Sequence, residues 1–313
     1  MAMNYRVSVP RAMPPYVRNF VVNSKALSPD MQPLVNLQTG TYWFVDNTDG
    51  DNTNDGRSWQ FAKATIQAAV NAAVAEDTIL IKPGTNYAEN VTVTAKHGLT
   101  LMAAGVPGNS KRVAIAPTTG IALTLAQNKR VSVIGIRCVG VADVGCLSDS
   151  EGSYFENCDF TSDTVHGFKF FANTDNDYTG SGSVFEYCLF RDCGGAGLRL
   201  FKGGPTAASP GYGLQATNVN LYHCQFYRNT GDDIDDDAGT ESPTYWYQWH
   251  IDMCYFMNRG KSEYLDMNGG DAGQDLLISN CYFNHANVTA TEIQLPTNGQ
   301  IIGCFDLAGI AVL

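Results

Sequence analysis

A six-residue phrase built around one cysteine recurs six times between residues 155 and 306. An apolar residue is followed by two variable residues, a Cys, one further variable residue and, in five copies, Phe. The copies read FENCDF (155–160), FEYCLF (185–190), LYHCQF (221–226), IDMCYF (251–256), ISNCYF (278–283) and the degraded IIGCFD (301–306). The cysteines are separated by 30, 36, 30, 27 and 23 residues. A constant phrase at uneven intervals indicates a solenoid whose corner is fixed and whose loops vary.

Strand geometry explains the phrase. Side chains alternate between the faces of a strand, so a Cys and a Phe two positions apart share a face. The apolar residue three positions before the Cys can share that face only if a corner lies between them. A third apolar element follows the Cys, as GFKF (167–170) and GLRL (197–200). The sequence therefore predicts an all-β fold, a right-handed parallel β-helix with three faces and roughly eight to ten coils.

The segment before the first coil has the pattern of a short helix. In KATIQAAVNAAVAED, Thr65 is a candidate N-cap, and Ile66, Ala69, Val70, Ala73 and Val74 lie on one helical face. An open solenoid end exposes apolar core, so we expect this helix to cap it. The predicted organisation is an extended basic arm (1–40), a strand, turn and capping helix (41–77), and a β-helix with a C-terminal cap (78–313).

The stretch from Tyr42 to Gly84, YWFVDNTDGDNTNDGRSWQFAKATIQAAVNAAVAEDTILIKPG, resembles the opening of pectate-lyase-like right-handed β-helix proteins. The resemblance extends over roughly residues 41–305 and implies the fold, but no particular activity, because that architecture carries lyases, hydrolases, phage tailspikes and non-enzymatic virion proteins. The plan of a short arm, a DNxxGDxxNDG opening and a compact β-helix is most similar to virion-associated β-helix proteins of phages. That likeness implies a homotrimer.

Charge is divided unevenly along the chain. The formal net charge is −11, yet residues 1–29 contain four basic residues and no acid, so the remainder carries −15. A basic, proline-containing arm on an acidic body predicts an attachment segment. Its expected partner-binding residues are Tyr5, Arg6, Arg11, Tyr16, Arg18 and Phe20. The acidic body argues against a nucleic-acid partner, and no apolar run is long enough for a membrane helix.

The acidic run GDDIDDDAG (231–239) is the candidate metal site. Its carboxylates, which could bind Ca²⁺ or form a solvated loop, are Asp232, Asp233, Asp235, Asp236 and Asp237. Alignment on Cys224 places Ile234 inward, Asp233 and Asp235 outward, and Asp236 inward. No Lys or Arg is expected at a matching position on a neighbouring coil. The sequence therefore predicts no catalytic residues and no cofactor other than this candidate Ca²⁺.

Long insertions recur at one corner of the coils, at 171–182, 201–218 and 238–248. They and the residues next to them carry aromatic side chains: Tyr178, Tyr212, Tyr245, Trp246, Tyr247 and Trp249. Such side chains fit an interface or stacking on sugars. The alternative is that they pack on one another and shield the coils.

The cysteines favour a cytoplasmic origin. Nine cysteines without a CxxC pair or a signal peptide predict buried, reduced thiols. Together these features predict a non-enzymatic structural component of a tailed-phage virion, assembled in the host cytoplasm. The specific expectation is a capsid decoration protein whose arm binds the capsid or another virion protein. The alternative is a tailspike-type polysaccharide depolymerase or lyase, or a glycan-binding β-helix.

Overall fold

The computed structural model divides the chain into two units, residues 1–40 and 41–313. It describes residues 40–105, 113–171, 180–201, 215–236, 245–257, 264–267, 274–284, 288, 292–295 and 298–312. The predicted arm therefore lies outside the described residues, together with Tyr178, Tyr212 and Asp237 of the candidate sites.

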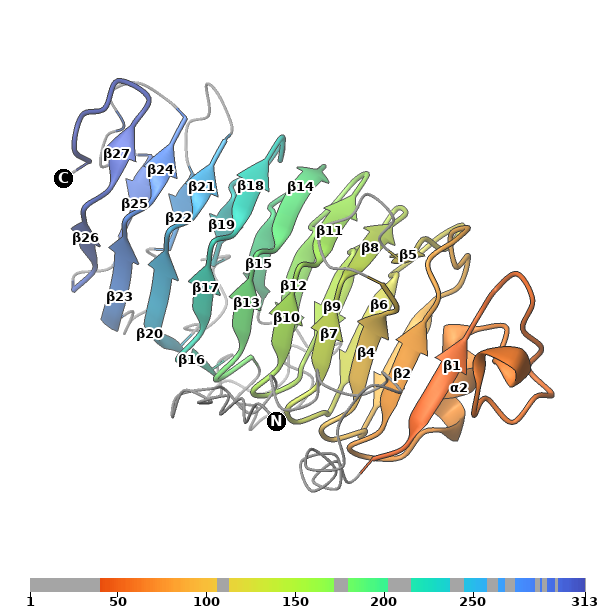
Figure 1. Cartoon of the computed structure of the whole chain (residues 1–313). Coiled ribbons are helices and arrows are strands. Elements are labelled where there is room, and N and C mark those ends of the chain that lie inside the picture. Colours follow the sequence, from red (N-terminus) through yellow and green to blue (C-terminus); the bar gives the residue numbers. More distant parts are fainter. Residues whose placement is uncertain are drawn as a thin grey trace, which may run out of the picture. The chain divides into compact units, whose positions relative to one another are not determined.

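Three parallel sheets wind through residues 41–313 (Figure 1). Sheet A contains β1 (Tyr42–Val45), β2 (Thr78–Ile81), β4 (Thr100–Ala103), β7 (Ser132–Ile134), β10 (Tyr154–Glu156), β13 (Val184–Glu186), β16 (Gln215–Thr217), β17 (Asn220–Tyr222), β20 (Tyr245–Asp252), β23 (Gln274–Ser279) and β26 (Gln300–Ile302). Sheet B contains β5 (Val113–Ile115), β8 (Ile136–Gly140), β11 (Asp159–Ser162), β14 (Leu189–Cys193), β18 (Gln225–Tyr227), β21 (Tyr255–Phe256), β24 (Tyr282–Phe283) and β27 (Phe305–Asp306). Sheet C contains β3 (Val91–Thr94), β6 (Leu123–Ala126), β9 (Cys146–Ser148), β12 (Phe168–Phe171), β15 (Leu198–Phe201), β19 (Ile234–Asp235), β22 (Leu265–Asp266) and β25 (Ile293–Gln294).

From β4 to β25 each coil contributes one strand to each sheet, with β16 as an additional strand of sheet A, and successive coils pair in parallel. Thus β10 pairs with β13, β11 with β14 and β12 with β15. The prediction of a right-handed parallel β-helix with three faces is confirmed.

The corner between sheets A and B is the bend that the cysteine phrase predicts. The residue before each Cys has a positive φ of 52–54° in five coils, at Asn157, Tyr187, His223, Met253 and Asn280. A left-handed conformation costs a non-glycine residue about 1–2 kcal/mol. Hydrogen bonds between coils hold this conformation, for example from the Asn157 N–H to the Glu186 carbonyl at 2.9 Å. The sixth copy has Gly303 at this position, where the conformation carries no such penalty.

The core consists of side-chain ladders that run from coil to coil. Phe190, Phe226, Phe256 and Phe283 stack in one column, with successive centroids 4.8–5.0 Å apart and rings within 8° of parallel. All nine cysteines are free and buried, as predicted. Burial raises the pKa of the Cys188 and Cys224 thiols. Cys188 and Cys224 therefore behave as small apolar side chains in this core.

One end of the solenoid is covered by a helix. In α2 (Ile66–Ala72) the Thr65 hydroxyl accepts the Ala68 N–H at 3.2 Å, and Ile66, Ala69 and Val70 are buried. The expected inward position of Val74 is wrong, because the helix ends at Ala72 and Val74 is 62% exposed. A 3-10 turn, η3 (Trp59–Phe61), precedes it. Within the described part of the chain, no helix has the length and apolarity needed to cross a membrane.

Candidate functional site

The outward face of sheet C carries a column of charged side chains. Strand register aligns Lys169 of β12 with Arg199 of β15, then with Asp235 of β19 and Asp266 of β22. We call these four residues the charged ladder. Their strand neighbours Phe168, Leu198, Ile234 and Leu265 are fully buried, so alternation places the ladder on the outside of the sheet.

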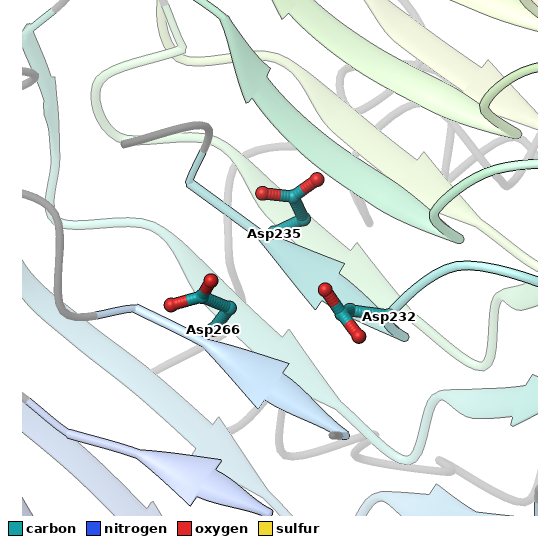
Figure 2. Close-up of side chains that lie close together, drawn as sticks. All are labelled: Asp232, Asp235 and Asp266. Atoms are coloured by element: carbon teal, nitrogen blue, oxygen red, sulfur yellow. The ribbon is translucent and has the colours of Figure 1, made fainter. Parts of the chain in front are cut away.

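Three carboxylates gather at one end of this ladder (Figure 2). One oxygen from each of Asp232, Asp235 and Asp266 lies within 4.8 Å of the others, and all three side chains are partly exposed. Clustered carboxylate oxygens are ligands that Ca²⁺ accepts, although its usual coordination number of six to eight requires further oxygens. The three acids are therefore able to contribute to a cation site, and Ca²⁺ binding stays a prediction.

Arg199 lies directly beside the acids. Its Nη1 is 3.2 Å from Asp235 Oδ2 and also 3.2 Å from His166 Nε2. The other ring nitrogen of His166, Nδ1, accepts the Ala196 N–H at 2.9 Å. The Ala196 N–H thus occupies the Nδ1 lone pair of His166, and Nε2 faces the Arg199 guanidinium.

The structure corrects one expectation about the acidic run and confirms another. Asp233 is fully buried instead of outward, and its Oδ1 accepts the Asn229 side-chain amide at 2.9 Å. It occupies the position of Gly197 on the preceding coil, just before the strand, where a Cβ would meet Asn229 at 2.8 Å and Phe226 at 3.0 Å. Strand alternation does not apply to this corner, which points the side chain inward. Asp236 is also fully buried, as the alignment on Cys224 predicts.

The expectation that no cation stands beside these acids is wrong. Arg199 occupies the position on the preceding coil that pairs with Asp235. The signal was present in the sequence, because GFKF and GLRL each place a basic residue at their third position, the second residue of β12 and of β15. Asp266 was missed for another reason: β22 starts eleven residues after its Cys, whereas β19 starts ten residues after Cys224. A shift of one residue in loop length hides the alignment.

The predicted aromatic edge is only partly described. Trp249 belongs to the core, since it is 1% exposed and its Nε1 donates to the Ala216 carbonyl at 2.7 Å. Its inclusion among exposed aromatic residues is therefore wrong. Tyr245, Trp246 and Tyr247 form the start of β20, whose backbone pairs with β16.

Comparison with known proteins identifies the class of fold. No protein-family model and no curated protein matches the chain. An alginate lyase from Paenibacillus sp. str. FPU-7 matches with a TM-score of 0.57 and 15% identity, over 77% of this chain and 83% of that chain. A pectin methylesterase from Aspergillus niger matches with a TM-score of 0.51 and 12% identity, over 87% of each chain. Geobacillus virus E2 ORF18 matches with a TM-score of 0.46 and 15% identity, over 89% of this chain and 64% of that chain.

The alginate lyase and pectin methylesterase matches show that the chain has the right-handed parallel β-helix fold. A lyase and an esterase share the scaffold, so the fold does not assign a reaction. The viral match is too weak to support an inference about function.

Proposed function

We propose that this β-helix is a non-enzymatic structural component of a tailed-phage virion, a capsid decoration protein attached through residues 1–40. The observation that carries the proposal is the division of charge, with +4 on residues 1–29 and −15 on the remainder. A basic arm with apolar residues suits an acidic patch on a shell protein. The acidic coils disfavour non-specific association.

The contacts of the charged ladder support a non-enzymatic role. A cation that acts in sugar chemistry must reach the substrate, whereas Arg199 is paired with Asp235 and lies against His166. His166 in turn uses Nδ1 to accept the Ala196 N–H. These groups are engaged with one another, and a substrate would have to compete for them.

Deletion of residues 2–25 tests the attachment. We expect the truncated protein to keep its melting temperature, because the coil core lies within residues 41–313. We expect its incorporation into virions to be lost, as measured by the amount of protein on purified particles. The triple variant Arg6→Gln, Arg11→Gln, Arg18→Gln keeps the length of the arm and isolates the contribution of its charge. A truncated protein that loads like the wild type contradicts the proposal.

A polysaccharide-binding or polysaccharide-cleaving role is the second candidate. It is favoured by the position of Asp232, Asp235 and Asp266 next to Arg199 on one sheet face. The test is incubation with alginate, with pectin and with host capsule, each with and without Ca²⁺, followed by measurement of chain length. We expect no shortening. If the wild type shortens a glycan and Arg199→Gln abolishes this without lowering the melting temperature, the enzymatic function replaces the structural one.

A further inference from the structure

Exposed apolar side chains concentrate on one face of the C-terminal coils. Among the described residues, twelve large hydrophobic side chains are exposed, and nine of them lie between residues 187 and 310. Five of these nine occupy outward positions along β18, β21 and β27 of sheet B, which lie side by side with β24 (Figure 1). We call this surface the aromatic face, formed by Tyr227, Tyr255, Met257, Tyr282, Phe305 and Leu307.

Register keeps these side chains in columns. Gln225 pairs with Tyr255, Tyr255 with Tyr282 and Tyr282 with Phe305, so four successive coils present this column outward. The rings of Tyr255 and Tyr282 are 6.2 Å apart. The phenylalanines between these outward positions point into the core and stack there. The aromatic face is therefore a repeated feature of the coils.

The size of the aromatic face suits a protein interface. Tyr227, Tyr255, Met257, Phe305 and Leu307 are between 37% and 50% exposed. With large side chains of about 200 Å² each, they offer roughly 400 Å² of apolar surface. This is the size of the largest apolar patch on a typical monomer, which is often a functional surface. A standard interface buries about 800 Å² on each partner, so the surface would form the centre of a contact with polar surroundings.

The aromatic face also differs from its surroundings in charge. The outward positions of its four strands carry no charged residue; they are Gln225, Tyr227, Tyr255, Met257, Tyr282, Asn284, Phe305 and Leu307. On earlier coils of the same sheet, Arg191 bonds Asp159 at 2.8 Å, and Arg228 at the boundary bonds Asp192 at 2.6 Å. These two arginines, which lie toward the border of the surface in the described part of the chain, are thus paired with carboxylates.

We propose that the aromatic face binds a second copy of this chain. Residues 30–313 carry −15, so two copies repel unless they meet through an uncharged surface. In a symmetric dimer, the aromatic face of one copy contacts the aromatic face of the other. Like charges in this surface would oppose such a contact, whereas its apolar side chains favour it. A basic partner protein would instead be expected to bind the acidic surface outside the aromatic face, because the aromatic face itself carries no charge. This inference is independent of the proposed virion function.

The test is the oligomeric state of the full chain. We expect the wild type to sediment as a dimer or larger species at high concentration and to dissociate on dilution. Tyr255→Glu with Phe305→Glu places like charges in the contact and should give a monomer at every concentration. Thr92→Glu with Thr94→Glu adds the same charge at exposed positions of β3 on sheet C and should behave as the wild type.

Three results would overturn the proposal. One is a wild type that stays monomeric at the highest concentration, which would assign the surface to a different partner. Another is association that survives in the Tyr255→Glu, Phe305→Glu variant. This result would place the contact on another part of the chain, such as the arm, which this variant retains. The last is equal dissociation by the Thr92→Glu, Thr94→Glu variant, which would show a general charge effect. If the Glu variant fails to fold, Tyr255→Ala with Phe305→Ala replaces it in the test. This variant adds no charge and should weaken association.

Discussion

Replacing Phe185 by Ala should lower the free energy of unfolding by about 3–5 kcal/mol, the usual range for a buried Phe. Phe185 is fully buried on β13 and stacks on Phe155 of the preceding coil, with centroids 4.7 Å apart and rings 9° from parallel. It also meets Phe168 edge-on at 5.0 Å. Removal of the Phe185 ring leaves a cavity beside Phe155 of sheet A and Phe168 of sheet C. The coils cannot close this cavity, because strand pairing holds them at a fixed spacing.

Tyr187→Ala is the matched control for this substitution. Tyr187 lies two residues further along the same coil, is 52% exposed and keeps a positive φ of 54°. Among the described residues its ring stacks on His223 alone, at the corner, so its loss should cost less than about 1 kcal/mol. Urea denaturation measures both variants, and a change in the slope of the transition would indicate that coils unfold separately. Equal destabilisation by the two substitutions would contradict the assignment of Phe185 to the centre of the core.

Asp77→Ala should destabilise the start of the solenoid by about 2 kcal/mol, because the buried Trp43 indole N–H and two partly buried backbone N–H groups lose their acceptor. The Asp77 side chain is 2% exposed and accepts the Thr41 N–H at 2.6 Å, the Trp43 Nε1–H at 2.9 Å and the Val74 N–H at 2.8 Å. These bonds join β1 to the segment between α2 and β2. Asp55→Ala is the control, since Asp55 is exposed and accepts only the nearby Arg57 N–H.

The contribution of Asp77 should depend on pH. Burial alone would raise the pKa of Asp77, but the hydrogen bonds from Thr41, Trp43 and Val74 outweigh it and hold the pKa below its usual value. A carboxylate with a lowered pKa stabilises the fold above the pKa of the unfolded chain, about 3.9. That stabilisation is lost as the pH falls through the lower pKa of the folded state. The difference in melting temperature between wild type and Asp77→Ala should therefore be constant near neutral pH and shrink below about pH 4. A gap that does not change between neutral and strongly acidic pH would contradict this role.

The amino-acid sequence alone determined the architecture of this protein. The fixed spacing of an apolar residue, Cys and Phe requires a corner followed by a strand. Repetition of that spacing requires parallel stacking, because each coil can bury its inward side chains only against neighbouring coils. The inward positions of Cys188, Phe190 and Ile234 follow from alternation, which is a local property of the chain. The cap at Thr65 is local in the same sense.

The contacts of the charged ladder and the aromatic face were decided by the tertiary structure. Arg199 and Asp235 are 36 residues apart in the sequence, and Asp266 follows 31 residues later. Loop length controls which of them align, and the phrase does not specify loop length. The inward direction of Asp233 could not be predicted from the sequence either, because the backbone conformation at a corner, and not strand alternation, sets the direction of its side chain. The sequence determines which side chains face the core through local alternation, whereas register between coils determines which outward side chains become neighbours.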